Sequence, residues 1–306
     1  LVDTVGGLNE KFDGAQDYDF VLRLTENTKK IYHCPRILYH WRCSNQSTAA
    51  SQGNKMYAIH AGKAALNAHY KRIGWNARAQ EGAVDGWYQT KFTLKEEPLV
   101  SILIPNKDHT DDLDVCLNSF FERADYQNYE FIIIENNSVL PETFAYYEKI
   151  EKEHDNVKVV YWEAGFNYSA INNFGFKFAK GDYIMLLNND VELITPDIFQ
   201  SMLGFCMRPE VGIVGAKLLY NDHTVQHAGV LVGAGGLADH VFKGIHEDDP
   251  GYMGRAISSQ DVSAVTAACL LVKRSVYEEV GGLEEEFQVA FNDVDFCLKV
   301  RKAGYL

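Results

Sequence analysis

One stretch of the sequence runs from apolar residues directly into a carboxylate flanked by amides. Residues 183–187 (YIMLL) are followed at once by Asn188, Asn189 and Asp190. An uninterrupted apolar run of this length is typical of a strand buried on both faces, as in a parallel sheet. Oxygen ligands at its carboxyl end suit a hard divalent cation. The same residues also suit an ordinary turn, since Asn and Asp tolerate turn geometry.

Three further apolar stretches end in acids and amides. They are residues 100–104 before Pro105-Asn106-Lys107-Asp108, residues 131–134 before Glu135-Asn136-Asn137-Ser138, and Ala290-Phe291 before Asn292-Asp293-Val294-Asp295. Open α/β sheets bind ligands at the carboxyl ends of their strands. If the sheet is parallel, the endings near residues 106, 135 and 190 share one edge, and the sequence predicts a polar cleft there.

The elements that would position these residues alternate between strands and helices from Leu99 onward. The predicted strands are 99–105, 131–135, 157–162, 183–188, 212–219 and 265–273, and the predicted helices are 111–123, 141–154, 169–179, 196–207 and 275–280. Such alternation predicts an α/β fold with a mostly parallel sheet and right-handed crossovers. Residues 220–254 are rich in Gly and His and are predicted to form loops or a hairpin over one edge.

The residues before Leu99 follow a different pattern. An extended segment is expected over 31–41, an amphipathic helix over 55–73 because apolar residues recur at helical spacing, and a partly extended linker over 76–97. Histidines His227, His240 and His246 in the Gly-rich region could approach a ligand, but solvated loop side chains are the preferred interpretation.

A repeat links the two ends of the chain. Residues 5–12 (VGGLNEKF) and 280–287 (VGGLEEEF) match, and so do 16–23 and 292–299 after a one-residue gap. A repeat at this distance indicates two copies of a domain rather than a solenoid. We therefore expect 1–95 to be the C-terminal remnant of an upstream module plus a helix and linker, and 96–306 a second module lacking its C-terminal end. Asp17, the counterpart of Asp293, is then expected to have no activity of its own.

Composition narrows the class of function. The 306 residues are 46% hydrophobic and 23% charged, with a net charge of −13 and a pI near 5.2. This charge argues against a nucleic-acid partner bound through a basic surface, and it makes a metal a natural supplement for a phosphate ligand. The longest apolar runs fall well short of a membrane span of ~20 residues, and no signal peptide opens the chain. Six cysteines without a CxxC pair indicate a reducing compartment.

These motifs resemble those of family 2 glycosyltransferases, which have the GT-A fold. The resemblance covers residues 99–306 and is carried by 100–105, 135–138, 188–190 and 291–295. The tandem arrangement is similar to that of bacterial transferases that build capsule or O-antigen polysaccharide, including rhamnose-containing ones. Residues 1–95 resemble the tail of a preceding module of the same kind.

The resemblance implies a donor site at the predicted cleft. Asn189 and Asp190 occupy the family's DxD position, so Asp190 would ligate Mn²⁺ or Mg²⁺ and Asn189 would face the ribose or sugar. The metal would neutralise the departing diphosphate. Glu135 stands where an Asp recognises the base, and its extra methylene leaves the base preference open.

Further donor-site residues follow from the same resemblance. Pro105 and Lys107 stand at positions that line the base pocket, although an aromatic residue is common where Lys107 stands. Asn172, with Phe166 and Asn167, resembles a loop-helix segment close to the nucleotide.

On the acceptor side, Asp293 matches the family's catalytic base. It would take the proton of the acceptor hydroxyl during an in-line displacement that inverts the anomeric carbon. Glu usually precedes this residue, whereas Asn292 stands here. Asp295 is interpreted as a helix-start residue that favours the N-terminal dipole, and Asp293 as a simple helix-start charge is the alternative.

The expected function is inverting transfer of a sugar from a UDP- or dTDP-sugar to a hydroxyl of a glycan or lipid-linked glycan, in cell-surface polysaccharide synthesis. A cytoplasmic location is expected, and peripheral association of the longer protein with the inner face of the membrane is left open. The family often places a metal-site His after the segment that matches 31–41, where His40 stands. A module that ends at Leu306 is therefore expected to be weak or inactive.

Three alternatives remain. The first is a non-catalytic sugar-nucleotide or glycan-binding module, or a scaffold, in a tandem glycosyltransferase, and turnover separates it from an enzyme. A nicotinamide dehydrogenase is disfavoured because residues 105–108 replace the GxGxxG turn. A glycosidase would need two carboxylates across one bond. Asp190 and Asp293 could form that pair, and nucleotide binding discriminates.

Overall fold

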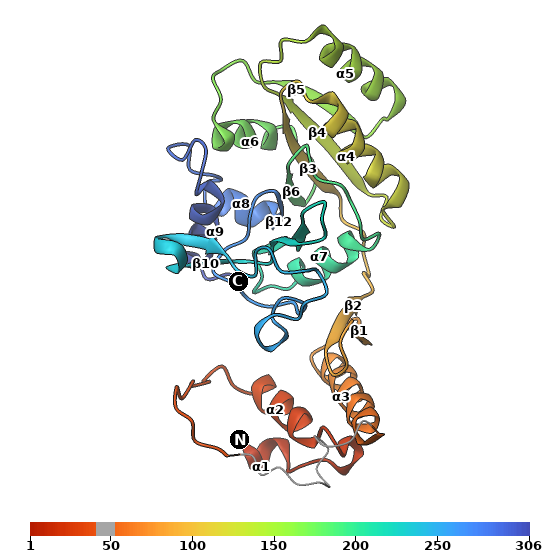
Figure 1. Cartoon of the computed structure of the whole chain (residues 1–306), viewed down its shortest axis with the longest axis vertical. Helices are drawn as coiled ribbons and strands as arrows, with labels where there is room; N and C mark the ends of the chain where they lie inside the picture. Colours follow the sequence, from red (N-terminus) through yellow and green to blue (C-terminus); the bar gives the residue numbers. More distant parts are fainter. Residues whose placement is uncertain (41–52) are drawn as a thin grey trace. The chain divides into compact units, whose positions relative to one another are not determined.

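The computed structural model describes residues 1–40 and 53–306. The chain divides into two compact units (Figure 1). Unit 1 comprises Leu1–Thr93 with Ile257–Ser259, and unit 2 comprises Leu94–Ala256 and Gln260–Leu306.

Unit 1 combines helices with one hairpin. Its elements are α1 (Val2–Val5), η1 (Glu10–Phe12), α2 (Gln16–Glu26), α3 (Gly53–Arg72), β1 (Ala77–Glu81) and β2 (Tyr88–Phe92). The helix predicted over 55–73 is confirmed. Residues 31–40 form no regular strand, and the remainder of the predicted extended segment lies outside the described residues.

The linker predicted over 76–97 is wrong in part, because β1 and β2 pair as an antiparallel hairpin. Gly86 makes the turn possible, since its φ of +86° is one that side chains rarely adopt. The hairpin is held to α3 by the Ala79 backbone N–H, which donates to Asn67 Oδ1 at 2.9 Å. This contact comes from a helix that lies earlier in the chain, so local sequence does not reveal it.

Unit 2 is built on a mixed sheet with the strand order β5-β4-β3-β6-β12-β7. The strands are β3 (Val100–Asn106), β4 (Tyr129–Glu135), β5 (Val157–Tyr161), β6 (Tyr183–Leu187), β7 (Ile213–Gly215) and β12 (Cys269–Lys273). Strands β3 to β6 are parallel, and β12 runs antiparallel between β6 and β7. The predicted α/β class and mostly parallel sheet are therefore confirmed.

Helices cover both faces of this sheet. They are α4 (Thr110–Arg123), α5 (Pro141–Glu153), α6 (Tyr168–Phe176), α7 (Ile198–Cys206), α8 (Arg274–Glu279) and α9 (Asn292–Lys302). Side chains from α4, α5 and α7 join Ile102 and Ile104 in one apolar cluster, whereas α6, α8 and α9 join Leu103 in the other. Successive strand residues point to opposite faces. Burial on both faces explains the uninterrupted apolar runs of β3, β4 and β6.

Two strands are shorter than predicted. The strand predicted over 212–219 is split into β7 and β8 (Leu218–Leu219). The strand predicted over 265–273 pairs only from Cys269, and residues 264–268 leave the sheet. The departing segment makes contacts in the site described below.

The Gly-rich region forms short antiparallel pairs, which confirms the predicted loops or hairpin. It contains β9 (Val225–His227), β10 (Val230–Val232), η2 (Ala234–Gly236), β11 (Ala238–His240) and η3 (Tyr252–Gly254), with β8 paired to β9 and β10 to β11. In the part of the chain that the structure describes, no helix has the length and apolar character needed to cross a membrane.

Candidate active site

The carboxyl ends of β6, β3 and β4 are joined by side-chain hydrogen bonds. Asn189 Nδ2 donates to Asn106 Oδ1 at 2.7 Å, and Asn106 Nδ2 donates to the Tyr147 hydroxyl at 2.8 Å. The Tyr147 hydroxyl in turn donates to Glu135 Oε2 at 2.9 Å. The predicted meeting of these three strand ends at one edge is confirmed.

Glu135 lies inside this edge with its carboxylate fully engaged. It is 3% exposed, and Oε1 accepts the Ser138 backbone N–H at 2.5 Å. Oε2 accepts the hydroxyls of Ser138, at 2.5 Å, and Tyr147. Burial raises the pKa of Tyr147, so its hydroxyl remains a donor. Glu135 thus shapes the loop after β4, and its direct recognition of a base stays a prediction.

The end of β6 presents Asp190 to solvent. The Asn188 backbone N–H is anchored to the Ala268 carbonyl at 3.1 Å, and the Asn189 amide is anchored as above. Asp190 is exposed and makes no hydrogen bond or ion pair to another residue that the structure describes. The two residues before Asp190 are therefore anchored, and the exposed carboxylate is open to a ligand.

The donor set at Asp190 fits a divalent ion that is shared with a phosphate ligand. Among residues 1–40 and 53–306, no group of three or more His, Cys, Asp or Glu side chains is arranged to hold a metal. Asp190 offers the hard carboxylate oxygen that Mn²⁺ and Mg²⁺ accept, and Mg²⁺ is commonly held by one or two carboxylates plus substrate phosphates. The residues therefore suit an ion that binds together with a nucleoside diphosphate.

The remaining predicted donor-site residues differ in accessibility. Lys107 is exposed and Pro105 half-buried, both at the end of β3 on the same edge as Asp190. Asn172 is fully buried in α6, where its Nδ2 donates to the Tyr168 carbonyl at 2.8 Å. A contact between Asn172 and a nucleotide stays a prediction, and the buried amide is better placed to stabilise α6.

Asp293 lies in the first turn of α9 and is held at both carboxylate oxygens. Oδ1 accepts the Val294 N–H at 2.8 Å, and Oδ2 accepts the Ala267 N–H at 3.2 Å. Asn292 is 5% exposed, and its Oδ1 accepts the Asp293 N–H at 2.8 Å. Phe291 has a φ of +61°, a conformation that is strained for a bulky residue and that clusters at functional sites.

Residues 264–268, which we call the connecting segment, join the parts of the site. The Thr266 N–H donates to His227 Nε2 at 3.4 Å, and the next N–H binds Asp293 as above. The Ala268 carbonyl accepts the Asn188 N–H. Three consecutive residues thus contact a buried histidine, the predicted base and the strand that carries the predicted metal ligand.

A small pocket lies beside Asp293. Its volume is about 240 Å³, and its walls come from β10, β11 and residues 289–294. Asp239 and His240 line it from β11, and Asn292 and Asp293 line it from the start of α9. Pockets for drug-sized ligands span ~300–1,000 Å³, so this one suits a single small ring or part of a larger ligand.

The expectation of solvated loop histidines is wrong for His227. It is 1% exposed, and its Nδ1 lies 2.9 Å from Nδ1 of His240. Burial, together with the neighbouring His240, lowers the pKa of His227 to about 3. The alternation of buried positions in β9 is too short to be recognised in a Gly-rich region. His246 has a 59% exposed side chain, as expected for a solvated residue.

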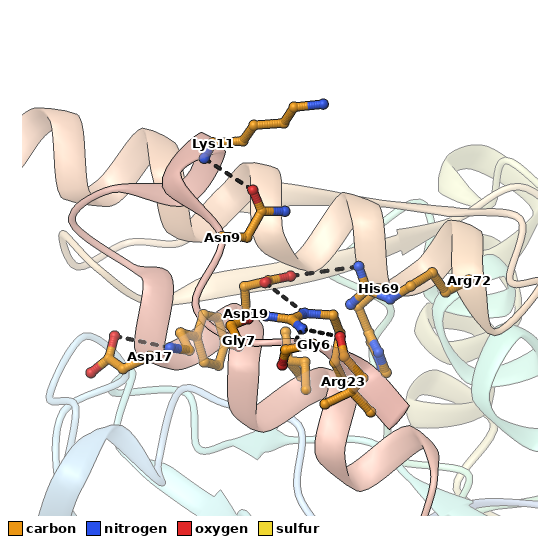
Figure 2. A network of polar contacts seen from close by, with 12 residues as sticks. Gly6, Gly7, Asn9, Lys11, Asp17, Asp19, Arg23, His69 and Arg72 are labelled. Carbon is orange, nitrogen blue, oxygen red and sulfur yellow. Dashed lines mark hydrogen bonds and ion pairs between the residues drawn. The ribbon is translucent and has the colours of Figure 1, made fainter. Parts of the chain in front are cut away.

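The first copy of the acid motif has its own polar network, which Figure 2 shows. Asp17 is exposed, and its Oδ1 accepts the Tyr18 N–H at 2.9 Å. Asp19 is fully buried and accepts Arg23 Nε at 2.8 Å. Arg23 also donates to the Val5 and Gly7 carbonyls, at 2.6 and 2.8 Å. This network fastens residues 5–7, at the start of the repeat, to α2.

The chain has sequence relatives among multi-domain proteins. It is 43% identical over its whole length to the uncharacterized protein y4gI of Sinorhizobium fredii, and it covers 34% of that protein. It is 38% identical, over 98% of its length, to the O-antigen biosynthesis protein RfbC of Myxococcus xanthus, and it covers 23% of that protein. The chain thus spans about a third or less of these relatives. A distant relative, 20% identical over 63% of the chain, is the low-salt glycan biosynthesis hexosyltransferase Agl10 of Haloferax volcanii.

A solved structure and a family match complete the assignment. The mannosyltransferase PcManGT of Pyrobaculum calidifontis, solved with GDP-Man and Mn²⁺, aligns with a TM-score of 0.51 and 14% identity over 81% of this chain and 63% of its own. This likeness shows a shared GT-A fold. Residues 101–281, more than half of the chain, match the family Glycosyl transferase family 2. The match contains the carboxyl ends of β3, β4 and β6, which form the polar edge of the sheet. The chain therefore belongs to glycosyl transferase family 2.

Proposed function

We propose that unit 2 transfers a sugar from a nucleoside diphosphate sugar to a hydroxyl group of a glycan, with inversion at the anomeric carbon. The observation that carries this proposal is the connecting segment, which fastens the Asp293 carboxylate and the strand before Asp190 to adjacent residues. A base and a diphosphate site held at fixed separation are what in-line displacement requires.

Donor binding is assigned to the polar edge of the sheet. Asp190 would hold Mn²⁺ or Mg²⁺ together with the diphosphate, and the metal would supply Lewis-acid stabilisation of the departing charge. Asn189 would face the ribose or sugar, and Pro105 and Lys107 would line the base pocket. Glu135 acts through Ser138 and Tyr147 by fixing the loop beside that pocket.

The chemical step is assigned to Asp293. As the acceptor oxygen forms its bond to the anomeric carbon, the bond from that carbon to the diphosphate breaks, and the hydroxyl proton moves to the carboxylate. Such proton transfer typically contributes ~10²–10⁴-fold. The Ala267 N–H bond to Oδ2 orients the carboxylate toward this task.

The donor, the acceptor and the cellular location are further parts of this proposal. We propose a UDP- or dTDP-sugar donor, a glycan or lipid-linked glycan acceptor and a role in cell-surface polysaccharide synthesis, which the relative named for O-antigen biosynthesis supports. We also propose a cytoplasmic location, with peripheral membrane association through the longer protein. The internal repeat supports residues 1–95 as the C-terminal part of a second module of this kind.

One observation favours a second candidate, a non-catalytic sugar-nucleotide or glycan-binding module. Asn292 stands where the resemblance leads one to expect a second acid, and its Nδ2 is buried without a hydrogen-bond partner. A binding module would retain nucleotide affinity and lack turnover.

Turnover of labelled sugar nucleotides separates the candidates. UDP-, dTDP- and GDP-sugars are incubated with the full chain and Mn²⁺ or Mg²⁺, and product anomers are assigned by NMR. The enzyme releases nucleoside diphosphate and inverts the anomeric configuration, and Asp125→Asn, at an exposed carboxylate away from the site, serves as the matched control. Nucleotide-dependent thermal stabilisation without turnover would favour the binding module.

A further inference from the structure

The paired rings of His227 and His240 have a defined proton arrangement. The Thr266 N–H occupies Nε2 of His227, so that nitrogen accepts and the neutral ring carries its proton on Nδ1. That proton faces Nδ1 of His240 at 2.9 Å. His240 must then accept at Nδ1, which places its own proton on Nε2. The tautomers are assigned from this hydrogen-bond network.

The burial of His227 maintains this arrangement. Because its ring is 1% exposed and its pKa is lowered to about 3, His227 stays neutral throughout the physiological range. Because Nε2 of the neutral His227 ring accepts the Thr266 N–H, its Nδ1 can only act as a donor toward His240. The pair is also unsuited to a metal, since the Nδ1 lone pair of His240 is used by His227.

The free side of His240 belongs to the pocket that contains Asp293. No described residue hydrogen-bonds Nε2 of His240, and the half-buried ring lines the pocket from β11. Asp293 lines it from the start of α9. The pocket lining therefore includes a hydrogen-bond donor and a carboxylate, the two kinds of group that bind and deprotonate sugar hydroxyls.

We propose that His240 binds the acceptor sugar by donating from Nε2 to a hydroxyl oxygen next to the hydroxyl that Asp293 deprotonates, and that His227 is the positioning residue that fixes the tautomer of His240. The ligand class is a pyranoside with a vicinal diol. This inference rests on the proposed function, because it requires Asp293 to face the acceptor.

Nitrogen-15 NMR of the histidine side chains tests the tautomers in the full chain. We expect His240 protonated at Nε2 and His227 at Nδ1, and we expect His227→Phe to convert His240 into a mixture of tautomers. Protonation of His240 at Nδ1 in the unchanged chain overturns the positioning role of His227.

Saturation-transfer NMR tests the ligand. The probes are methyl α-mannoside, methyl α-rhamnoside and methyl α-glucoside, each with a nucleoside diphosphate and Mg²⁺. His240→Leu should weaken glycoside binding about tenfold, the upper end of one hydrogen bond. His240→Gln, which retains an N–H donor, should preserve it, and nucleotide affinity should stay unchanged in both.

The outcomes separate this inference from the function on which it rests. Equal glycoside binding by the chain and by His240→Leu, or no glycoside binding by the unchanged chain, overturns the role of His240, while nucleotide turnover by the unchanged chain still supports a transferase. Absence of nucleotide binding in the unchanged chain overturns the proposed function itself.

Discussion

Helices α2 and α9 begin with the same acid motif, and their surroundings differ. In α9, Asp293 accepts an N–H from the connecting segment, and the helix buries Phe296, Cys297 and Val300 against the sheet of unit 2. In α2, Asp17 is exposed, and the only buried residue of the helix is Asp19. The same motif thus begins a helix in both copies, and in α9 the proposed base is also held by the connecting segment.

The two copies also differ in the side chain that ties the VGGL segment, residues 5–8 or 280–283 with their neighbours, to the following helix. Arg23 pairs with Asp19 and donates to loop carbonyls through its planar fork, a geometry that Lys lacks. Lys299 takes the equivalent position in α9 and reaches Glu284 at 3.2 Å and Asp295 at 3.6 Å. Buried charge stabilises the helix start in unit 1, and apolar packing does so in unit 2.

The largest expected difference between the copies is catalytic. Asp293→Asn keeps the shape and removes the base, so sugar transfer should fall by ~10²–10⁴-fold while nucleotide affinity is retained. Asp17→Asn is the matched change in the other copy and should leave the rate unaltered. Initial rates with a labelled donor measure both, and equal losses would contradict the assignment of the base to α9 alone.

The next effect concerns the exposed acid of unit 2. Asp190→Ala should remove the metal-dependent part of nucleoside diphosphate binding, because Asp190 is the proposed carboxylate ligand of the ion at this edge. Calorimetry with and without Mn²⁺ measures the difference, and Asp125→Asn should bind like the unchanged chain. Equal metal-dependent affinity in Asp190→Ala would refute the metal assignment.

A smaller effect concerns the stability that Arg23 and Lys299 contribute to their own copies of the motif. Arg23→Ala leaves the buried Asp19 carboxylate with Arg72 as its remaining cation, 3.5 Å away, and should cost about 3 kcal/mol of folding free energy. Lys299→Ala removes a partly exposed pair and should cost less than about 1 kcal/mol. Urea unfolding, followed by signals from each unit, measures the loss of folding free energy in both variants. Similar losses would show that the two side chains stabilise their copies equally.

A pH-dependent effect concerns the buried ring of His227 in unit 2. The pKa of His227 is lowered to about 3, so below pH ~6.5 the unfolded chain binds a proton that the folded chain does not. His227 should therefore reduce stability by up to about 1.4 kcal/mol per pH unit as pH falls from ~6.5 toward 3. Urea unfolding from pH 7 to 4 should show this slope in the His246→Gln control and a weaker one in His227→Phe.

Local sequence was sufficient for the central elements. The apolar runs of β3, β4 and β6 follow from burial on both faces, and Pro141 at the first turn of α5 marks a helix start. The polar edge follows too, because parallel strands place their ends together.

Contacts between distant segments account for what the sequence did not predict. Glu135 is engaged by Tyr147 from α5, a partner twelve residues away that no local motif indicates. His227 is buried through the connecting segment, which itself was predicted to be strand. The connecting segment is held away from the sheet by a contact with α9, in which Cys297 Sγ accepts the Val265 N–H at 3.4 Å.

The connecting segment also limits how homologous enzymes can vary. Neighbouring peptide groups in it serve different parts of the site, so inserting or deleting one residue would offer Asp293 a peptide group that faces another way. The hairpin of β10 and β11 can change in length at its tip without that consequence. We therefore infer that acceptor preference diversifies through the hairpin, while the number of residues between Thr266 and β12 stays constant wherever the base is retained.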